Sequence, residues 1–90
     1  MCRNIKTLFN FAPPATDDEV RAASIQFVRK LSGYTAPSKG NHKAFERAVE
    51  NTFRVARELI DSLETEAPPK DRATEAAKAK AKNAIRFGRA

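Results

Sequence analysis

The stretch PPATDDEVRAASIQFVRKLSG, residues 13–33, contains the signals for both ends of a helix. Thr16 is a good N-cap, and Glu19, three residues later, completes a capping box. The two aspartates between them place negative charge at the positive end of the helix dipole. Gly33 is a typical residue just after a helix, because glycine adopts the left-handed conformation without steric cost. The stretch therefore predicts a helix between Thr16 and Gly33.

One face of this first helix carries apolar and small side chains at the spacing of 3.6 residues. Its members are Val20, Ala23, Ser24, Phe27 and Leu31. Ile25 falls on the opposite, otherwise polar side, so we expect another part of the chain to cover it.

A second helix is predicted from near Asn41 to about Leu63, after a loop that contains Pro37 and Gly40. Along it, apolar and small side chains recur in steps of four and three, as in a helix packed lengthwise on another. The members of this seam are Phe45, Val49, Thr52, Ala56, Leu59 and Leu63, widened by Phe53 and Ile60. The two helices then form a helical hairpin over residues 16–66.

The second helix, at about 33 Å, is longer than the first helix can cover. Part of its apolar seam is then left without a partner inside the chain. We therefore expect a homodimer that forms through the second helix.

Proline pairs separate the hairpin from both ends of the chain, at Pro13-Pro14 and at Pro68-Pro69. The N-terminal segment, residues 1–15, has four apolar side chains, whose spacing fits either one helical turn or an extended strand-like segment. These side chains are Ile5, Leu8, Phe9 and Phe11. Both conformations stay open, and in either one we expect the segment to cover the core of the hairpin.

Residues 67–90 change composition and predict a basic third helix rich in alanine and lysine. A narrow seam of alanines runs along one side, formed by Ala73, Ala77, Ala81 and Ala84. Docking through this seam is expected to be weak, because alanine buries little apolar area. The fold class expected for the whole chain, residues 1–90, is a single all-α domain.

Charge is concentrated in the last 21 residues, where seven bases and two acids give +5 of the total net charge of +6. Four of the bases lie on the side of the third helix opposite the alanines: Lys78, Lys82, Arg86 and Arg89. Successive members of the first three are about 6 Å apart along the axis, a spacing that can follow the phosphates of a nucleic acid. This pattern favours nucleic acid, or another polyanion, as a partner. The competing interpretation is a soluble helical terminus that binds nothing.

Several classes of site are disfavoured by the sequence. One cysteine and one histidine cannot form a structural zinc site within the chain, and three scattered glycines make no nucleotide-binding loop, so we expect neither metal nor cofactor. No apolar run approaches the length of a membrane span, and no secretory signal is visible. With a single cysteine as well, we expect a cytoplasmic protein with no membrane partner.

Cys2 supports an alternative function of a different class. Removal of Met1 would leave this cysteine at the N-terminus, and the neighbouring Arg3 favours its thiolate, which is the reactive form. The alternative is therefore a small thiol-dependent or redox protein that acts through Cys2. We favour a non-enzymatic binding protein, with the basic helix as its contact, over this alternative. The reason is that nothing in the sequence places a general base beside the thiol.

The opening MCRNIKTL, followed by Phe11 and by PPAT at residues 13–16, resembles a known family. It is similar to the bacterial small proteins catalogued as domain of unknown function twenty-two seventy-seven. The likeness continues through Gly33 and APP at residues 67–69 to the alanine- and lysine-rich end of the chain. The resemblance implies a small, mostly helical bacterial protein without an assigned activity. It marks Cys2, Arg3 and Asn4 as part of the opening motif of the family but gives them no role.

Overall fold

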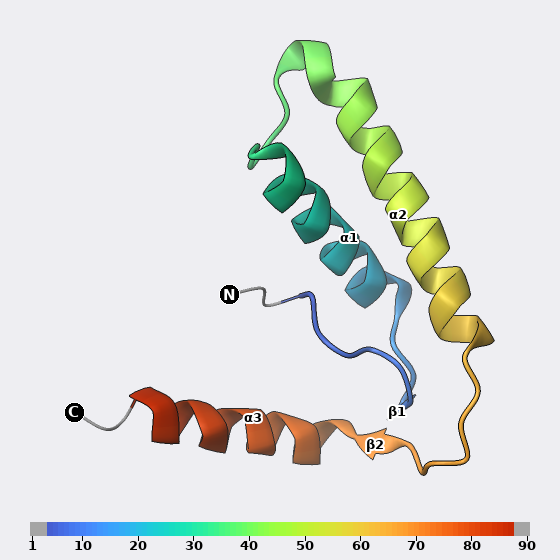
Figure 1. Ribbon diagram of the computed structural model, residues 1–90, viewed down its shortest axis with the longest axis vertical. Coiled ribbons are helices and arrows are strands. Elements are labelled where there is room, and N and C mark those ends of the chain that lie inside the picture. The colour runs from blue at the N-terminus through green and yellow to red at the C-terminus, as the bar shows by residue number, and fades with distance from the viewer. Residues whose placement is uncertain (1–3, 88–90) are drawn as a thin grey trace.

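The computed structural model describes residues 4–87, except the side chains of Ala79 and of residues 82–87. The elements in chain order are β1 (Phe11–Ala12), α1 (Asp17–Ser32), the 3-10 helix η1 (Lys39–Asn41), α2 (His42–Ser62), β2 (Lys70–Asp71) and α3 (Arg72–Phe87). The chain is therefore mostly helical, as expected, and α1 and α2 form the predicted hairpin (Figure 1). The expected all-α class misses one feature, a pair of two-residue parallel strands.

Both predicted ends of α1 are confirmed. The Glu19 N–H donates to the Thr16 hydroxyl at 3.2 Å, and the Thr16 N–H donates to the Glu19 carboxylate at 2.9 Å, which completes the capping box. At the other end Gly33 has φ 79, and its N–H donates to the Arg29 carbonyl at 2.9 Å. These local interactions determine where α1 begins and ends.

The core lies between α1 and α2. Val20, Ser24 and Val28 are buried on α1, and Val49 is buried on α2. Ser24 is the buried polar side chain of this contact, and its hydroxyl donates to the Val20 carbonyl at 2.9 Å. Because that hydroxyl is hydrogen-bonded within its own helix, it can be buried at little cost.

The buried face of α1 matches the predicted one at Val20 and Ser24 and differs from it farther along the helix. Phe27 and Leu31, which were expected in the core, are 44% and 72% exposed. Val28 is buried instead, because the row of α1 side chains that contacts α2 lies farther around the helix than predicted. Ile25, half-buried, faces α2 and lines a groove together with Phe45, so the expectation that Ile25 is covered is confirmed.

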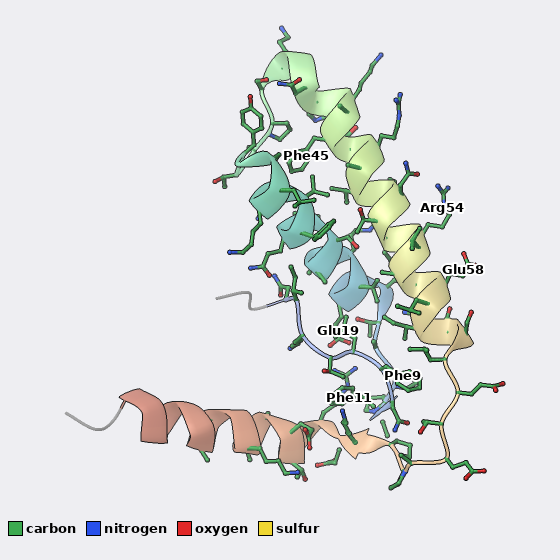
Figure 2. All side chains as sticks on the ribbon, viewed as in Figure 1. Phe9, Phe11, Glu19, Phe45, Arg54 and Glu58 are labelled. Carbon is green, nitrogen blue, oxygen red and sulfur yellow. The ribbon has the colours of Figure 1, made fainter. Side chains whose placement is uncertain are left out.

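The predicted seam of α2 is confirmed along most of its length. Phe45, Thr52, Ala56 and Ile60 are half-buried beside the buried Val49. Figure 2 shows Phe45 directed toward α1, whereas Arg54 and Glu58 point away from it. The last seam residues are Leu59 and Leu63, which are 56% and 44% exposed.

Charged side chains line one side of the hairpin. The Arg21 guanidinium donates to the Glu50 carboxylate, and its central carbon lies 4.4 Å from the centroid of the Phe53 ring. Arg57 pairs with Asp61 at 2.7 Å and donates a second hydrogen bond to the backbone of the segment before α1. The Arg21–Glu50 pair thus joins α1 to α2 on this side, and the backbone bond of Arg57 joins α2 to the segment before α1.

The N-terminal segment is extended, which decides between its two predicted conformations. Asn10 turns the chain with a positive φ of 65, a conformation that asparagine tolerates better than most residues. Its side-chain amide donates to the Pro68 carbonyl at 3.2 Å, and its own carbonyl accepts from the Lys70 N–H at 2.8 Å. Phe11 then pairs with Lys70 in the parallel register of β1 and β2.

The molecule is flat, with extents of 43 × 41 × 15 Å. A helix with its side chains is about 10–12 Å across, so the hairpin forms a single layer. The radius of gyration is 15.9 Å, whereas a compact chain of this length has about 12 Å. The difference arises because α3 extends away from the hairpin and begins beside its open end (Figure 1).

Candidate anion-binding helix and its attachment

Within the predicted basic segment, residues 67–90, the helix α3 begins at Arg72, after the proline pair and β2. Asp71 acts as its N-cap, because one oxygen of its carboxylate accepts hydrogen bonds from both the N–H and the hydroxyl of Thr74 at 2.8 Å. These two hydrogen bonds lower the pKa of Asp71. A carboxylate at this position also stabilises the positive end of the helix dipole.

Arg72 attaches the first turn of α3 to the start of α1. Its guanidinium donates two hydrogen bonds to the carboxylate of Glu19, at 2.8 and 2.9 Å, and a third to the Pro13 carbonyl at 2.8 Å. The bonds from Arg72, and then the one from the Thr16 N–H, lower the pKa of Glu19 to about 2. Glu19 is therefore ionised at neutral pH. Its carboxylate caps α1 and also binds Arg72 at the start of α3.

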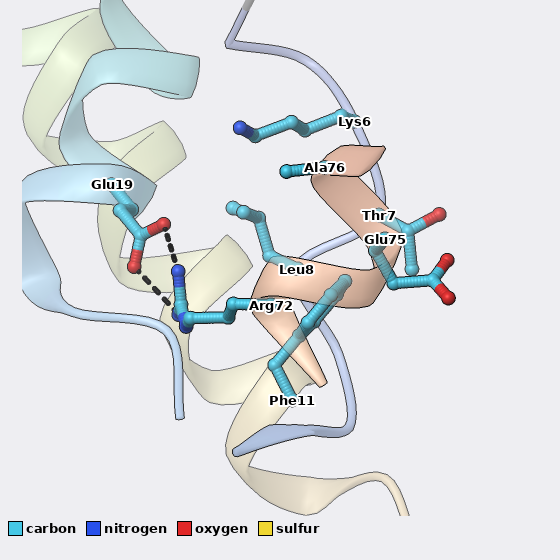
Figure 3. Close-up of a pocket in the computed structure, with 8 residues that line it drawn as sticks. All are labelled: Lys6, Thr7, Leu8, Phe11, Glu19, Arg72, Glu75 and Ala76. Carbon is cyan, nitrogen blue, oxygen red and sulfur yellow. Dashed lines mark hydrogen bonds and ion pairs between the residues drawn. The ribbon is translucent and has the colours of Figure 1, made fainter. Parts of the chain in front are cut away.

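A cavity of about 310 Å³ lies between the N-terminal segment and the first turn of α3 (Figure 3). Its lining consists of Lys6, Thr7, Leu8, Phe11, Glu19, Arg72, Glu75 and Ala76. The ring of Phe11 lies beneath two cations, with Lys70 Nζ and the central carbon of Arg72 each 5.6 Å from its centroid. The charges of Glu19 and Arg72 are paired with one another and are not directed at a ligand. We therefore interpret the cavity as part of the contact between α3 and the hairpin.

Beyond its first turn, the described part of α3 is open to solvent. Arg72 and Glu75 are half-buried, whereas Lys78 and Lys80 are exposed. Lys78 forms an ion pair of 3.3 Å with Glu75, and its side chain is still 70% exposed. Of the other predicted contact residues, Lys82 and Arg86 belong to α3, but their side chains lie outside the described residues, as does all of Arg89.

The alanine seam of α3 packs against nothing in the described part of the chain. Ala73, Ala77 and Ala81 are exposed, and the side chain of Ala84 lies outside the described residues. Arg72 contacts the hairpin through Glu19, and Glu75 lies beside Thr7 of the N-terminal segment (Figure 3). The helix is thus held by polar contacts at one end, which agrees with the expectation that alanine docks weakly.

The candidate thiol, Cys2 with its neighbour Arg3, lies outside the described residues. The next residue is held, since the Asn4 N–H donates to the Gln26 side-chain oxygen at 2.8 Å on α1.

Within the described residues, no group of three or more histidine, cysteine or carboxylate side chains is arranged to hold a metal ion. No described helix combines the length and the apolar character that crossing a membrane requires.

Two residues outside the motifs recognised in the sequence take part in the attachment of α3 to the hairpin: Arg72, which bonds to Glu19, and Asn10, which bonds to the chain just before α3. Glu19 was recognised as part of the cap of α1, but its bonds to Arg72 were not. Asn10 follows a phenylalanine and precedes another, a pattern with no distinct signal. Arg72 stands next to a recognisable cap, Asp71, which could have shown that the helix begins there.

Residues 1–78 match the model of a protein family described as uncharacterized conserved protein (DUF2277). The chain belongs to this family. The match includes Cys2 and Arg3, Asn10, the Glu19–Arg72 pair and the first turn of α3, and it ends at Lys78. No curated protein and no solved structure matches the chain.

Proposed function

We propose that this member of the family is a non-enzymatic binding protein whose helix α3 contacts a polyanion, nucleic acid in the first place. One observation carries the proposal: within the described part of α3, the first turn alone is attached to the rest of the chain. Past Glu75 the described side chains of α3 are exposed, so a long partner can approach the helix from several sides. Residues 70–90 carry a net charge of +5, which supplies the attraction.

The spacing of the bases supports contact with phosphates. Lys78, Lys82 and Arg86 follow one another at intervals of four residues, or about 6 Å along the axis of α3. Binding of this kind depends on salt and carries no sequence preference by itself. Lys80 lies on another side of the helix, about 200° from Lys78, and is the natural control.

The test is binding of the full chain to labelled single- and double-stranded nucleic acid across a salt series. Replacement of Lys78 and Lys82 by glutamate is expected to abolish binding, while Lys80→Glu, which makes half the change in charge, weakens it far less. The logarithm of the affinity falls linearly with the logarithm of the salt concentration. For a duplex, each lost phosphate contact makes this slope less steep by about 0.9. If the wild-type chain does not bind at low salt, or if Lys80→Glu weakens binding as much as the double variant, the proposal is wrong.

The homodimer through α2 stays part of the proposal. Two copies would carry two basic helices, and a second helix raises the effective concentration of cations along one polyanion. The surface through which such a dimer forms is a separate question, and its answer does not depend on what α3 binds.

A further inference from the structure

The side of the hairpin opposite its charged pairs presents a continuous apolar face. Four large apolar side chains are exposed there, with Phe27 at 44%, Leu31 at 72%, Val55 at 66% and Leu59 at 56%. A groove between α1 and α2 connects the first two with Ala48 and Thr52, and the steps 48, 52, 55 and 59 keep the rest on the same side of α2. We call this set the apolar face: Phe27, Leu31, Ala48, Thr52, Val55 and Leu59.

This face differs from ordinary scattered exposure of single apolar residues. Its members adjoin one another, and such contiguous patches mark places where another surface packs. The hairpin is one layer thick, at 15 Å for the shortest extent of the molecule, whereas helical domains ordinarily bury apolar stripes between two layers. Among the described residues, the four large side chains of the apolar face keep 44% to 72% of their surface exposed.

The net charge of the hairpin, counted over all its sides, differs between its two ends. Residues 29–49, at the closed tip of the hairpin, contain five bases and one acid. Residues 50–66, toward the open end, contain two bases and five acids. One end of the hairpin is therefore positively charged and the other end negatively charged. Its best electrostatic complement is a second copy of the hairpin that runs in the opposite direction.

We propose that two copies of this chain stack through their apolar faces, head to tail, into an antiparallel four-helix arrangement. The two-fold axis passes near Thr52, the middle residue of α2. Leu31 of one copy then lies toward Leu59 of the other, and each basic tip lies over the acidic end of its partner. An isologous contact of this kind uses the same surface on both subunits and closes after two copies.

The first test is the mass of the full chain in solution, by sedimentation or light scattering across a concentration series. We expect a species of twice the chain mass of 10.0 kDa. Val55→Glu puts a charge into the centre of the contact and is expected to raise the dissociation constant about a hundredfold. Arg54→Gln changes the net charge by the same amount at a neighbouring residue that points away from α1, and it should leave the dimer intact.

The arrangement is tested by crosslinking in a Cys2→Ser background. Thr52→Cys places a thiol next to the axis, so oxidation should join two chains, whereas Arg54→Cys should not. If the chain is a monomer at every concentration, the proposal is wrong. This holds both when α3 of the same chain covers the apolar face and when the face stays exposed. A dimer that Arg54→Gln weakens as much as Val55→Glu overturns it as well. So does a dimer that strengthens with salt, because head-to-tail stacking relies on opposite charges.

Discussion

The carboxylate of Glu19 accepts two hydrogen bonds from the guanidinium of Arg72, 53 positions later in the chain, at 2.8 and 2.9 Å. The same carboxylate accepts the Thr16 N–H at 2.9 Å and thereby caps α1. One side chain thus links the start of the hairpin to the start of the basic helix. Because both helices begin at this point, its loss affects the order of α1 and the position of α3 together.

Replacement of Arg72 by methionine tests this link. Methionine keeps a long apolar side chain near the Phe11 ring but removes all three hydrogen bonds of the guanidinium. We expect the melting temperature to fall by about 5 °C and the amides of the first turn of α3 to exchange faster. Circular dichroism and hydrogen exchange measure the two effects.

The control for this variant is Arg54→Met, which makes the same change at an arginine of α2 whose side chain bonds to its own helix at Asn51. It should leave the melting temperature and the exchange of α3 nearly unchanged. Equal effects of the two substitutions would show that the Arg72 contact adds nothing beyond an ordinary surface arginine.

The pH dependence of stability follows from the lowered pKa of Glu19. Its pKa is about 2 in the folded chain against an ordinary value of 4.5, so its contribution to the free energy of unfolding is complete above about pH 4.5. That contribution is lost as the pH falls from 4.5 toward 2. Urea unfolding should show Glu19→Gln less stable than the wild type at pH 7, with the difference closing near pH 2.

Other carboxylates also lower the stability of the chain in acid, since the pKa values of Glu50 and Asp71 are lowered by their own partners. The comparison of wild type with Glu19→Gln removes these common contributions, because both proteins retain them. A stability difference that stays constant from pH 7 to pH 2 would contradict the assigned role of Glu19.

Local features of the fold could be predicted from sequence, and the long-range contacts could not. The cap at Thr16 and the end at Gly33 depend on residues at most four positions apart, so their signals are complete in a short stretch. The Glu19–Arg72 pair depends on where the linker after α2 places the chain, which no local pattern specifies. The basic side of α3 was visible as periodicity, but its attachment through Arg72 was not.

The buried face of α1 shows the same limit on a smaller scale. Beside Val20 and Ser24, Phe27 and Leu31 fit helical spacing as well as Val28 does, and they carry more apolar surface. Which line is buried depends on how α2 crosses α1. In this hairpin the larger side chains stay exposed, and they are the ones that the proposed dimer would cover.

The thiol alternative is tested by Cys2→Ser in the full chain. Under the binding function proposed above, the substitution leaves both the helical content and the salt-dependent affinity for nucleic acid unchanged. Intact mass, measured with and without a thiol-directed alkylating reagent, shows whether Met1 is removed and whether Cys2 reacts. Loss of nucleic-acid binding in Cys2→Ser, with the fold retained, would move the function to the thiol.

The small core makes the chain sensitive to the truncation of one buried side chain. Val20 is 1% exposed and packs between α1 and α2, so Val20→Ala leaves a cavity and should lower the free energy of unfolding by about 2 kcal/mol. This is a large share of the stability of a domain this small. Val55→Ala makes the same change at a residue that is 66% exposed, and in solutions dilute enough to hold monomers it should cost little, because alanine favours a helix. Urea unfolding of both variants measures the contrast, and equal losses would place Val55 in a core that the single chain already forms.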